Sequence, residues 1–269
     1  MACPNFFHMG KHRIAIFTSD DYTWSFSAWK RTIPEFFARY DVVGIYLFSD
    51  VLHGLKGWQI LFWYLRTFGL LTFLLLALHA IKTRYLEIFS GIYTWQQLAD
   101  AHHIALHYAA TPNAPEVCIW VKENNIDIIF ITVGQILKKD IINVPNIGII
   151  NKHAAVLPSC RGLFPYLWAK FTNAPTGVTF HQVDATIDTG KILVQKRYDN
   201  GNASMLQFYK LVFSQFPALA LQAAEHLVEK NYLPTPTDVQ ASYFGLPTKT
   251  DVKAYRKKGY YIARFIDLL

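Results

Sequence analysis

Residues 151–195 read NKHAAVLPSCRGLFPYLWAKFTNAPTGVTFHQVDATIDTGKILVQ, and this stretch decides the fold. Asn151 and His153 come directly after an apolar run that contains Ile147, Ile149 and Ile150. A run of this kind predicts a buried strand. Side chains two residues apart in a strand lie on one face. We therefore expect the Asn151 carboxamide and the His153 imidazole to point the same way at the end of this strand.

The same stretch continues with turn, helix and strand signals and reaches two carboxylates. Leu157-Pro158 predicts a turn, residues 163–171 a short helix and residues 178–182 an alternating strand. Asp184 and Asp188 follow, before a further strand at residues 192–194. Asn, His and Asp are the residue types needed to move an acyl group onto an amine.

Four short motifs in this stretch resemble the core of the folate-dependent formyltransferases. They are N-x-H at 151–153, LP-x-x-RG at 157–162, TGVT at 176–179 and IDTG-x-I at 187–192. N-x-H and D-T-G are common tripeptides alone, so it is their order together that carries the resemblance. It implies that Asn151, His153 and Asp188 form the family's catalytic triad, with 10-formyltetrahydrofolate as co-substrate.

The chemistry of formyl transfer assigns a role to each member of this triad. An amine attacks the formyl carbon, and the tetrahedral intermediate carries a negative oxygen that needs hydrogen-bond donors. Asn151 can donate an amide N–H to that oxygen. His153 can donate as well, or can accept the proton of the incoming ammonium. Asp188 is expected to orient the imidazole and to stabilise a positive charge on it. The order of the proton transfers stays open.

Two loops are predicted to bind the folate. Residues 127–133 (DIIFITV) predict a strand covered on both faces, and ligands of open α/β sheets bind beyond the carboxyl ends of such strands. The resemblance places the pterin against the loop that follows and against the loop between the two aspartates. The predicted cofactor-binding residues are Val133, Gly134, Gln135, Ile136, Leu137, Asp184, Ala185, Thr186 and Ile187.

Two further residues of the central stretch have open roles. Arg161 is expected either to contact substrate or to anchor its own loop. Cys160 stands where relatives carry an aromatic residue, and we interpret it as a packing residue because no activating partner is visible.

The N-terminal half predicts an α/β fold. Residues 13–18 and 41–48 are apolar strand patterns, and residues 24–40 between them fit a helix, with Pro34 expected near its start or at a kink. This order argues for a βαβ unit and a parallel sheet. With the resemblance, we expect a Rossmann-like formyltransferase domain at residues 11–230: a mostly parallel twisted sheet flanked by helices. An apolar helical insertion at 53–90 and a C-terminal extension at 231–269 complete the prediction.

The insertion is the most apolar part of the chain. Residues 57–81 read GWQILFWYLRTFGLLTFLLLALHAI. The unbroken apolar part, 68–80, is shorter than the ~20 residues that a membrane-spanning helix needs. Three alternatives stay open: a helix or helix pair packed on the domain or across a homodimer, a segment lying on a membrane surface with Lys56, Arg66, Lys82 and Arg84 near the headgroups, and a true span.

The composition favours anionic ligands but does not identify one. The 269 residues carry a formal net charge of +7, which suits an anionic ligand such as folate glutamates, a nucleotide-sugar, tRNA or an acidic lipid surface. Cys3, Cys118 and Cys160 show no pairing or metal spacing, so we expect a reduced, cytoplasmic compartment and no catalytic metal. The N-terminal residues 1–12 lack the apolar core of a secretory signal.

The remaining signals lie after the central stretch. Residues 204–230 predict a long amphipathic helix that Pro217 divides or kinks, and residues after Thr250 predict a short basic helix ending at Gly259. The tail leaves no room for the full C-terminal barrel of methionyl-tRNA formyltransferases, so no nucleic-acid partner is expected.

The sequence therefore predicts transfer of a formyl group to a primary amine, with an amino sugar, free, nucleotide-linked or lipid-linked, as the favoured small-molecule acceptor. A hydrolase that releases formate, a methionyl-tRNA formyltransferase-like acceptor and a non-catalytic binding relative stay open as alternatives. We expect the protein in the cytoplasm, or at the inner face of the membrane if the insertion lies there.

Overall fold

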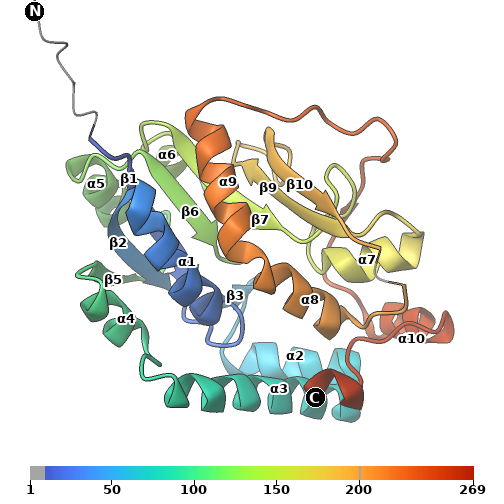
Figure 1. Cartoon of the computed structure of the whole chain (residues 1–269). Helices are drawn as coiled ribbons and strands as arrows, with labels where there is room; N and C mark the ends of the chain where they lie inside the picture. Colours follow the sequence, from blue (N-terminus) through green and yellow to red (C-terminus); the bar gives the residue numbers. More distant parts are fainter. Residues whose placement is uncertain (1–9, 200) are drawn as a thin grey trace, which may run out of the picture.

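A seven-stranded sheet runs through the molecule, with its strands in the order β10-β9-β7-β6-β1-β2-β5 (Figure 1). The computed structural model describes residues 10–199 and 201–269. The predictions for Cys3 and for most of the N-terminal stretch lie outside the described residues. The strands of this sheet are β1 (Arg13–Ser19), β2 (Asp41–Phe48), β5 (Ala105–Ala109), β6 (Ile128–Thr132), β7 (Gly148–His153), β9 (Gly177–Gln182) and β10 (Ile192–Arg197).

The predicted mostly parallel sheet is confirmed. β1 pairs in parallel with β2 and β6, β2 with β5, and β6 with β7. β9 runs antiparallel to β7, and β10 runs antiparallel to β9. Consequently the carboxyl ends of β1, β2, β6 and β7 meet at one edge, which is where an open α/β sheet places its ligands.

Alternate residues of the strands pack into separate cores on the two faces of the sheet. In β1, Ile14 and Ile16 belong to the larger core, whereas Ala15 and Phe17 belong to the smaller one. On the larger side α1 (Ser25–Arg39) contacts α9 (Phe216–Val228), and Figure 1 shows both helices lying over the near face of the sheet. The smaller core includes residues of α5 (Pro115–Glu123) and α6 (Lys139–Ile142). Both faces are covered, which explains the continuous apolar runs of the parallel strands.

Several helix boundaries refine the sequence predictions. Pro34 lies well inside α1, where Trp29, Ile33 and Phe36 are fully buried on both sides of it. The predicted helix 204–230 consists of two helices, because the chain breaks at Gln215, just before Pro217, between α8 (Met205–Ser214) and α9. The remaining helices of the domain are α4 (Trp95–Ala101) and α7 (Pro165–Thr172).

Side-chain caps define the starts of three helices. Thr94 caps α4 by accepting from the Gln97 amide, but the Gln97 side chain accepts from Tyr93 instead of completing the capping box. Ser204 and Gln207 form a full box at α8. The C-terminal helix α10 (Lys249–Lys257) is capped by Thr248.

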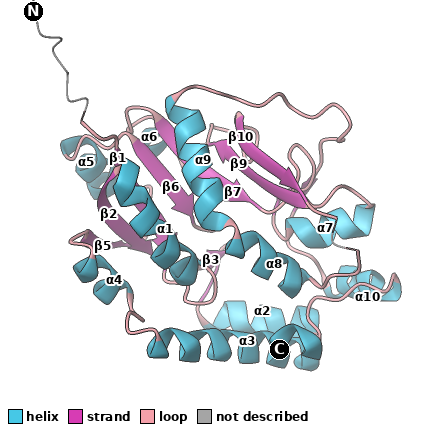
Figure 2. Ribbon diagram, in the orientation of Figure 1, coloured by secondary structure: helices cyan, strands magenta, loops and turns pink. Residues whose placement is uncertain are grey.

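The apolar insertion is a helix pair. α2 (Trp58–Phe68) and α3 (Leu70–Phe89) meet at Gly69, whose φ of 78° is a backbone conformation that favours glycine. A short hairpin of β3 (Val51–Leu52) and β4 (Leu55–Lys56) precedes them. Figure 2 shows the two helices side by side below the sheet. Within the described residues, no helix is both long and apolar enough to cross a membrane.

The C-terminal extension packs back onto the domain. β11 (Tyr243–Phe244) pairs in parallel with β8 (Arg161–Gly162) of the central stretch. α10 contacts α2, and the short 3₁₀ helix η1 (Phe265–Leu268) contacts α3. Arg256 of α10 donates from Nη2 to the carbonyl of Phe68 (2.5 Å) and to Oγ1 of Thr72 (2.7 Å). The extension therefore fixes the turn of the helix pair.

This anchor gives a testable prediction for stability. Arg256→Ala removes two hydrogen bonds made by a charged donor, and we expect the free energy of unfolding to fall by about 1–2 kcal/mol in urea titrations. The matched control is Lys257→Ala, an exposed neighbour on the same helix, which should change it by less than about 0.5 kcal/mol. Equal effects of the two substitutions would show that Arg256 does not anchor the turn.

Candidate active site

The candidate site is a cavity of about 560 Å³ at the carboxyl ends of β6 and β7. Its walls include the loop after β6, the last residues of β7 and the loop between β9 and β10. All residues predicted from the sequence to be catalytic or cofactor-binding line it: Val133, Gly134, Gln135, Ile136, Leu137, Asn151, His153, Asp184, Ala185, Thr186, Ile187 and Asp188. We call this space the site cavity.

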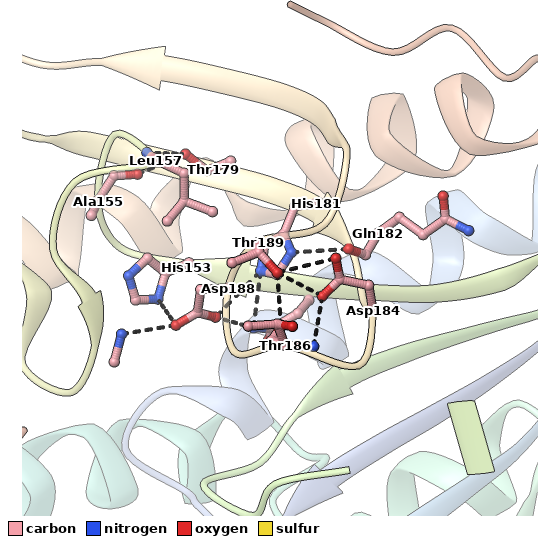
Figure 3. A network of polar contacts seen from close by, with 12 residues as sticks. His153, Ala155, Leu157, Thr179, His181, Gln182, Asp184, Thr186, Asp188 and Thr189 are labelled. Carbon is pink, nitrogen blue, oxygen red and sulfur yellow. Dashed lines mark hydrogen bonds and ion pairs between the residues drawn. The ribbon is translucent and has the colours of Figure 1, made fainter. Parts of the chain in front are cut away.

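The carboxylate of Asp188 lies at the centre of the polar groups (Figure 3). Its Oδ2 accepts a hydrogen bond from the Gly162 amide at 2.9 Å and lies 3.6 Å from Nδ1 of His153. Its Oδ1 lies 3.5 Å from Nε2 of His181 and 3.4 Å from Nδ2 of Asn151. Three segments of the chain, the R-G loop, β7 and β9, thus converge on one buried carboxylate.

Backbone geometry explains why Asp188 reaches this position. The loop between β9 and β10 is closed by Asp184, whose Oδ1 accepts from the Thr186 amide at 3.0 Å and from the Thr189 hydroxyl at 2.8 Å. Asp188 itself has a φ of 53°, in the left-handed region. A Cβ at Gly190 would lie 1.7 Å from the Gln182 carbonyl, so only glycine fits there. The Asp184 side chain thus closes a loop that lines the cavity.

The ring of His153 is oriented by a backbone carbonyl. Nε2 lies 2.8 Å from the carbonyl oxygen of Cys160 and therefore carries the proton that it donates. Cys160 has a φ of 54°, and this left-handed conformation aims its carbonyl at the ring. The orienting hydrogen bond, which was expected from Asp188, is thus made by the Cys160 carbonyl, while Asp188 lies within ion-pair distance of the ring. Asp188 faces the other ring nitrogen, Nδ1, beyond hydrogen-bond distance.

The protonation states of this pair follow from burial and pairing. Burial lowers the pKa of His153 below its ordinary value, although the nearby Asp188 carboxylate opposes that change. Burial alone raises the pKa of Asp188, but His181, His153 and the Gly162 amide together outweigh it and hold that pKa at about 2. At neutral pH the site thus holds an ionised Asp188 beside a neutral His153 whose Nδ1 is free to accept a proton.

His181 is the site residue that the sequence analysis missed. It is 2% exposed, its Nδ1 lies 3.1 Å from the Gln182 carbonyl, and its Nε2 lies 3.3 Å from Nδ2 of Asn151 and 3.5 Å from Oδ1 of Asp188. The antiparallel register places His181 directly opposite Asn151. The sequence does show a histidine in the alternating strand, between the apolar Phe180 and the predicted catalytic Asp188. Its place in the site could be predicted only with the pairing of β7 and β9, which the sequence does not show.

The loop after β6 is held rigid by side chains from neighbouring loops. Nε2 of Gln135 donates to the carbonyls of Ser49 and Ala110, each at 3.1 Å. Asn113 donates to the Ile136 carbonyl at 2.9 Å and accepts from the Lys138 amide at 2.7 Å. The polar side chains are thus engaged with the scaffold, so a ligand in the site cavity meets backbone groups and the apolar Val133, Ile136 and Leu137.

Arg161 and Cys160 serve the loop that carries Gly162. Arg161 does not line the site cavity, and both its amide and its Nε face the Ser242 carbonyl of the C-terminal extension. This geometry favours the anchoring role over substrate contact. The Cys160 side chain is fully buried, and burial raises the pKa of its thiol, as a packing residue requires. A Cβ at Gly162 would lie 2.3 Å from the Phe244 carbonyl, which explains the glycine in R-G.

The donor set of the site contains no metal-binding arrangement within the described ranges. No group of three or more His, Cys, Asp or Glu side chains there is placed to hold an ion. The imidazoles instead face a carboxylate, an amide and two carbonyls.

Comparison with known proteins extends the sequence resemblance. A formyl transferase family model matches residues 92–200, which span β7, β9 and the loop that carries Asp188. Methionyl-tRNA formyltransferase of Geobacter metallireducens is 37% identical over 106 residues, which cover 39% of this chain and 34% of that protein. The match thus spans about a third of the length of that curated relative.

Solved structures share the fold over most of the chain. A sugar N-formyltransferase from a Shewanella species aligns over 87% of this chain and 77% of its own, with a TM-score of 0.54 and 17% identity. The N-formyltransferase from Helicobacter canadensis, solved with folinic acid and dTDP-3-aminofucose, aligns over 87% of this chain and 70% of its own, with a TM-score of 0.52 and 16% identity. At these identities the likeness concerns the fold.

The matched segment and the shared fold agree with the four motifs of the central stretch. Residues 92–200, which carry the predicted triad, are similar to the formyl transferase family, and these findings support a place in the folate-dependent formyltransferase superfamily.

Proposed function

We propose that the protein transfers a formyl group from 10-formyltetrahydrofolate to a primary amine. The observation that carries the proposal is the convergence of Asn151, His153 and Asp188 on one cavity that the two predicted folate loops also line. The amide can donate a hydrogen bond to the negative oxygen, the imidazole can accept a proton, and the carboxylate can stabilise the imidazolium. Transfer of a formyl group from one nitrogen to another needs these functions.

The folate loops suit a pterin. Residues 133–137 offer backbone groups and apolar side chains, and residues 184–187 offer the backbone of a closed loop. The family match motivates folate as the co-substrate, and one neighbour in fold was solved with folinic acid. Held between these loops, the donor would present its formyl carbon to the end of β7.

Side chains of the site can accept the proton that the amine releases and can stabilise the negative oxygen of the tetrahedral intermediate. Nδ2 of Asn151 points toward Asp188 and His181 and can donate to the oxygen of the tetrahedral intermediate. Neutral His153 accepts at Nδ1 the proton released by the attacking amine, and the Asp188 carboxylate 3.6 Å away stabilises the resulting imidazolium. The amine is the nucleophile, so no covalent enzyme intermediate is required.

An amino sugar is the acceptor that we favour. Support comes from the neighbours in fold, one named a sugar N-formyltransferase and one solved with an amino-sugar nucleotide. The curated relative that matches in sequence is named for methionyl-tRNA instead, so a tRNA acceptor is the second candidate. A nucleotide-sugar and Met-tRNA differ so much in size that a panel of small amines separates the two.

We further propose that the helix pair contacts a membrane surface. This is the second of the three alternatives for residues 57–81, in which the segment lies on the membrane without crossing it. Both helices expose large apolar side chains, including Trp58 (73%), Leu71 (73%) and Ile81 (65%). The exposed charges beside them are Lys56, Arg66 and Lys82, all basic, of which Lys82 also donates to the Leu268 carbonyl. The acidic Glu87 is paired with Lys30 at 2.8 Å. Like charges disfavour a second copy of this face and suit anionic lipid. Arg84, in contrast, lies against the Tyr22 ring and is not free for headgroups.

Substitutions in the triad test the catalytic proposal. Asn151→Ala should lower kcat by about 10²–10³, as loss of an oxyanion donor does, and His153→Ala by about 10²–10⁴, as loss of a general base does. Folinic acid affinity, measured by calorimetry, should change little in either variant. His103→Ala, at an exposed histidine away from the cavity, is the matched control. Transfer at the wild-type rate by His153→Ala would overturn the assignment.

Vesicle co-sedimentation tests the membrane contact. The unmodified protein should pellet with vesicles that contain anionic phospholipid and stay in solution with purely zwitterionic ones, because both apolar area and basic charge contribute. Leu71→Glu combined with Ile81→Glu should abolish pelleting without changing folinic acid binding. A protein that ignores both kinds of vesicle, or that forms a dimer through this face, contradicts the membrane contact.

A further inference from the structure

A second cavity, of about 620 Å³, lies next to the site cavity and has not been given a role. It is enclosed by the helix pair, the start of α1, α8 and the loop after β2. We call it the helix-pair cavity. Its volume falls in the range of small-molecule sites, which are mostly apolar with a few placed polar groups.

The two cavities meet at the end of β7. Val51, Gly134, Lys152 and Leu163 line both of them. Lys152 stands between Asn151 and His153 in the strand, so it points to the opposite face from those two side chains. A molecule in the helix-pair cavity therefore lies next to the strand end that carries Asn151 and His153, separated from the site cavity by residues that line both.

The two ends of the helix-pair cavity differ in polarity. Near the strand ends it presents the carboxyl group of Asp50 and the amine of Lys152, which can bond to hydroxyls and to an amino group. Nζ of Lys152 has no hydrogen bond among the described residues and lies 3.7 Å from the centre of the Phe213 ring. Toward the helices the wall is formed by apolar side chains such as Phe73, Leu76 and Ala77.

An unsatisfied group on the wall also points to a ligand. His79 is 8% exposed, and its Nε2 has no hydrogen-bond partner in the described part of the chain. Its ring lies against Trp24 at 5.0 Å, within the wall of the cavity. Buried polar atoms without a partner are rare in folded proteins, so a polar group of a bound molecule, and not its hydrocarbon chain, would satisfy this nitrogen.

The apolar wall continues to the outside of the molecule. Leu61 lines the helix-pair cavity and is 59% exposed on the face of α2 that also carries Trp58 and Leu65. A hydrocarbon chain that leaves the cavity here passes onto apolar surface and is never forced into water.

We propose that the helix-pair cavity binds the acceptor and that this acceptor is an amphiphile. Its polar headgroup carries the primary amine and lies near Asp50 and Lys152, while its hydrocarbon chain lies along α2 and α3. The proposal rests on the proposed function, because it names the substrate class of the same site.

The test compares two acceptors that share a headgroup, methyl and octyl β-D-glucosaminide. Binding is measured by calorimetry below the micelle concentration, with and without saturating folinic acid. The octyl compound should bind more tightly, by up to about fourfold for each methylene that enters the cavity. Equal affinities of the two glycosides would overturn the proposal.

Matched variants on α3 test where the hydrocarbon chain of the acceptor binds. Ala77→Trp fills the cavity and should remove the preference for the octyl compound, whereas Leu78→Trp, at an exposed neighbour outside the cavity, should keep it. Phe73→Ala, which removes part of the wall without adding bulk, should weaken the preference. If the preference survives in both Ala77→Trp and Phe73→Ala, the chain binds on the outer face and the cavity assignment is wrong.

Folinic acid separates this proposal from the formyl transfer on which it rests. Its binding to Ala77→Trp should equal that of the wild type, because Ala77 does not line the site cavity. If folinic acid binds to neither protein, the folate role of the site cavity fails, while the chain preference measured without it still decides the acceptor class.

Discussion

The buried carboxylate of Asp188 is the constraint on which the site depends. Moving an ion out of water costs several kcal/mol unless the surroundings replace its hydration. Here the Gly162 amide, the Asn151 carboxamide and His181 do so, and the pKa of about 2 corresponds to about 2 kcal/mol in favour of the charged form. Each of these partners comes from a different segment. The end of β7, the R-G loop, β9 and the loop that carries Asp188 are therefore held in one arrangement.

The ionised carboxylate also decides what the imidazole can do. Because the Cys160 carbonyl engages Nε2, the nitrogen that faces the cavity side is Nδ1, and burial keeps the ring neutral. A neutral ring beside a fixed negative charge accepts a proton readily and holds it once accepted. This geometry supports the proposed role of His153 as the group that accepts the proton of an attacking amine.

Much of this arrangement could be predicted from the sequence, for identifiable reasons. The strands of the parallel sheet are covered on both faces, so they appear as apolar runs such as residues 41–48, and β2 has those bounds. The four motifs, taken in order, predict Asn151, His153 and Asp188 as the triad, and the structure places all three on one cavity. What escaped prediction depends on long-range register or on backbone conformation. His181 enters the site only through its pairing opposite Asn151, and the Cys160 carbonyl reaches His153 only because φ is positive there. Likewise, no local pattern shows that the extension would supply β11 and Arg256.

The helix pair of α2 and α3 is an addition to the parallel-sheet domain. It leaves the parallel sheet and its site in place and adds a wall beyond the strand ends, with one side toward a cavity and the other toward the exterior. The apolar residues 57–81 thus stand beside the polar site cavity. Under our proposal, they select an acceptor that carries a hydrocarbon chain.

The central claim is that a one-carbon unit moves from folate to an amine at this site. The most direct measurement follows both products of one reaction that contains 10-formyltetrahydrofolate and a panel of amino sugars. Tetrahydrofolate release is read by absorbance and amine formylation by mass spectrometry. The account predicts one formylated amine for each tetrahydrofolate released, and no release when the amine is left out. Release of tetrahydrofolate and formate at the same rate without any amine would contradict it and identify a hydrolase.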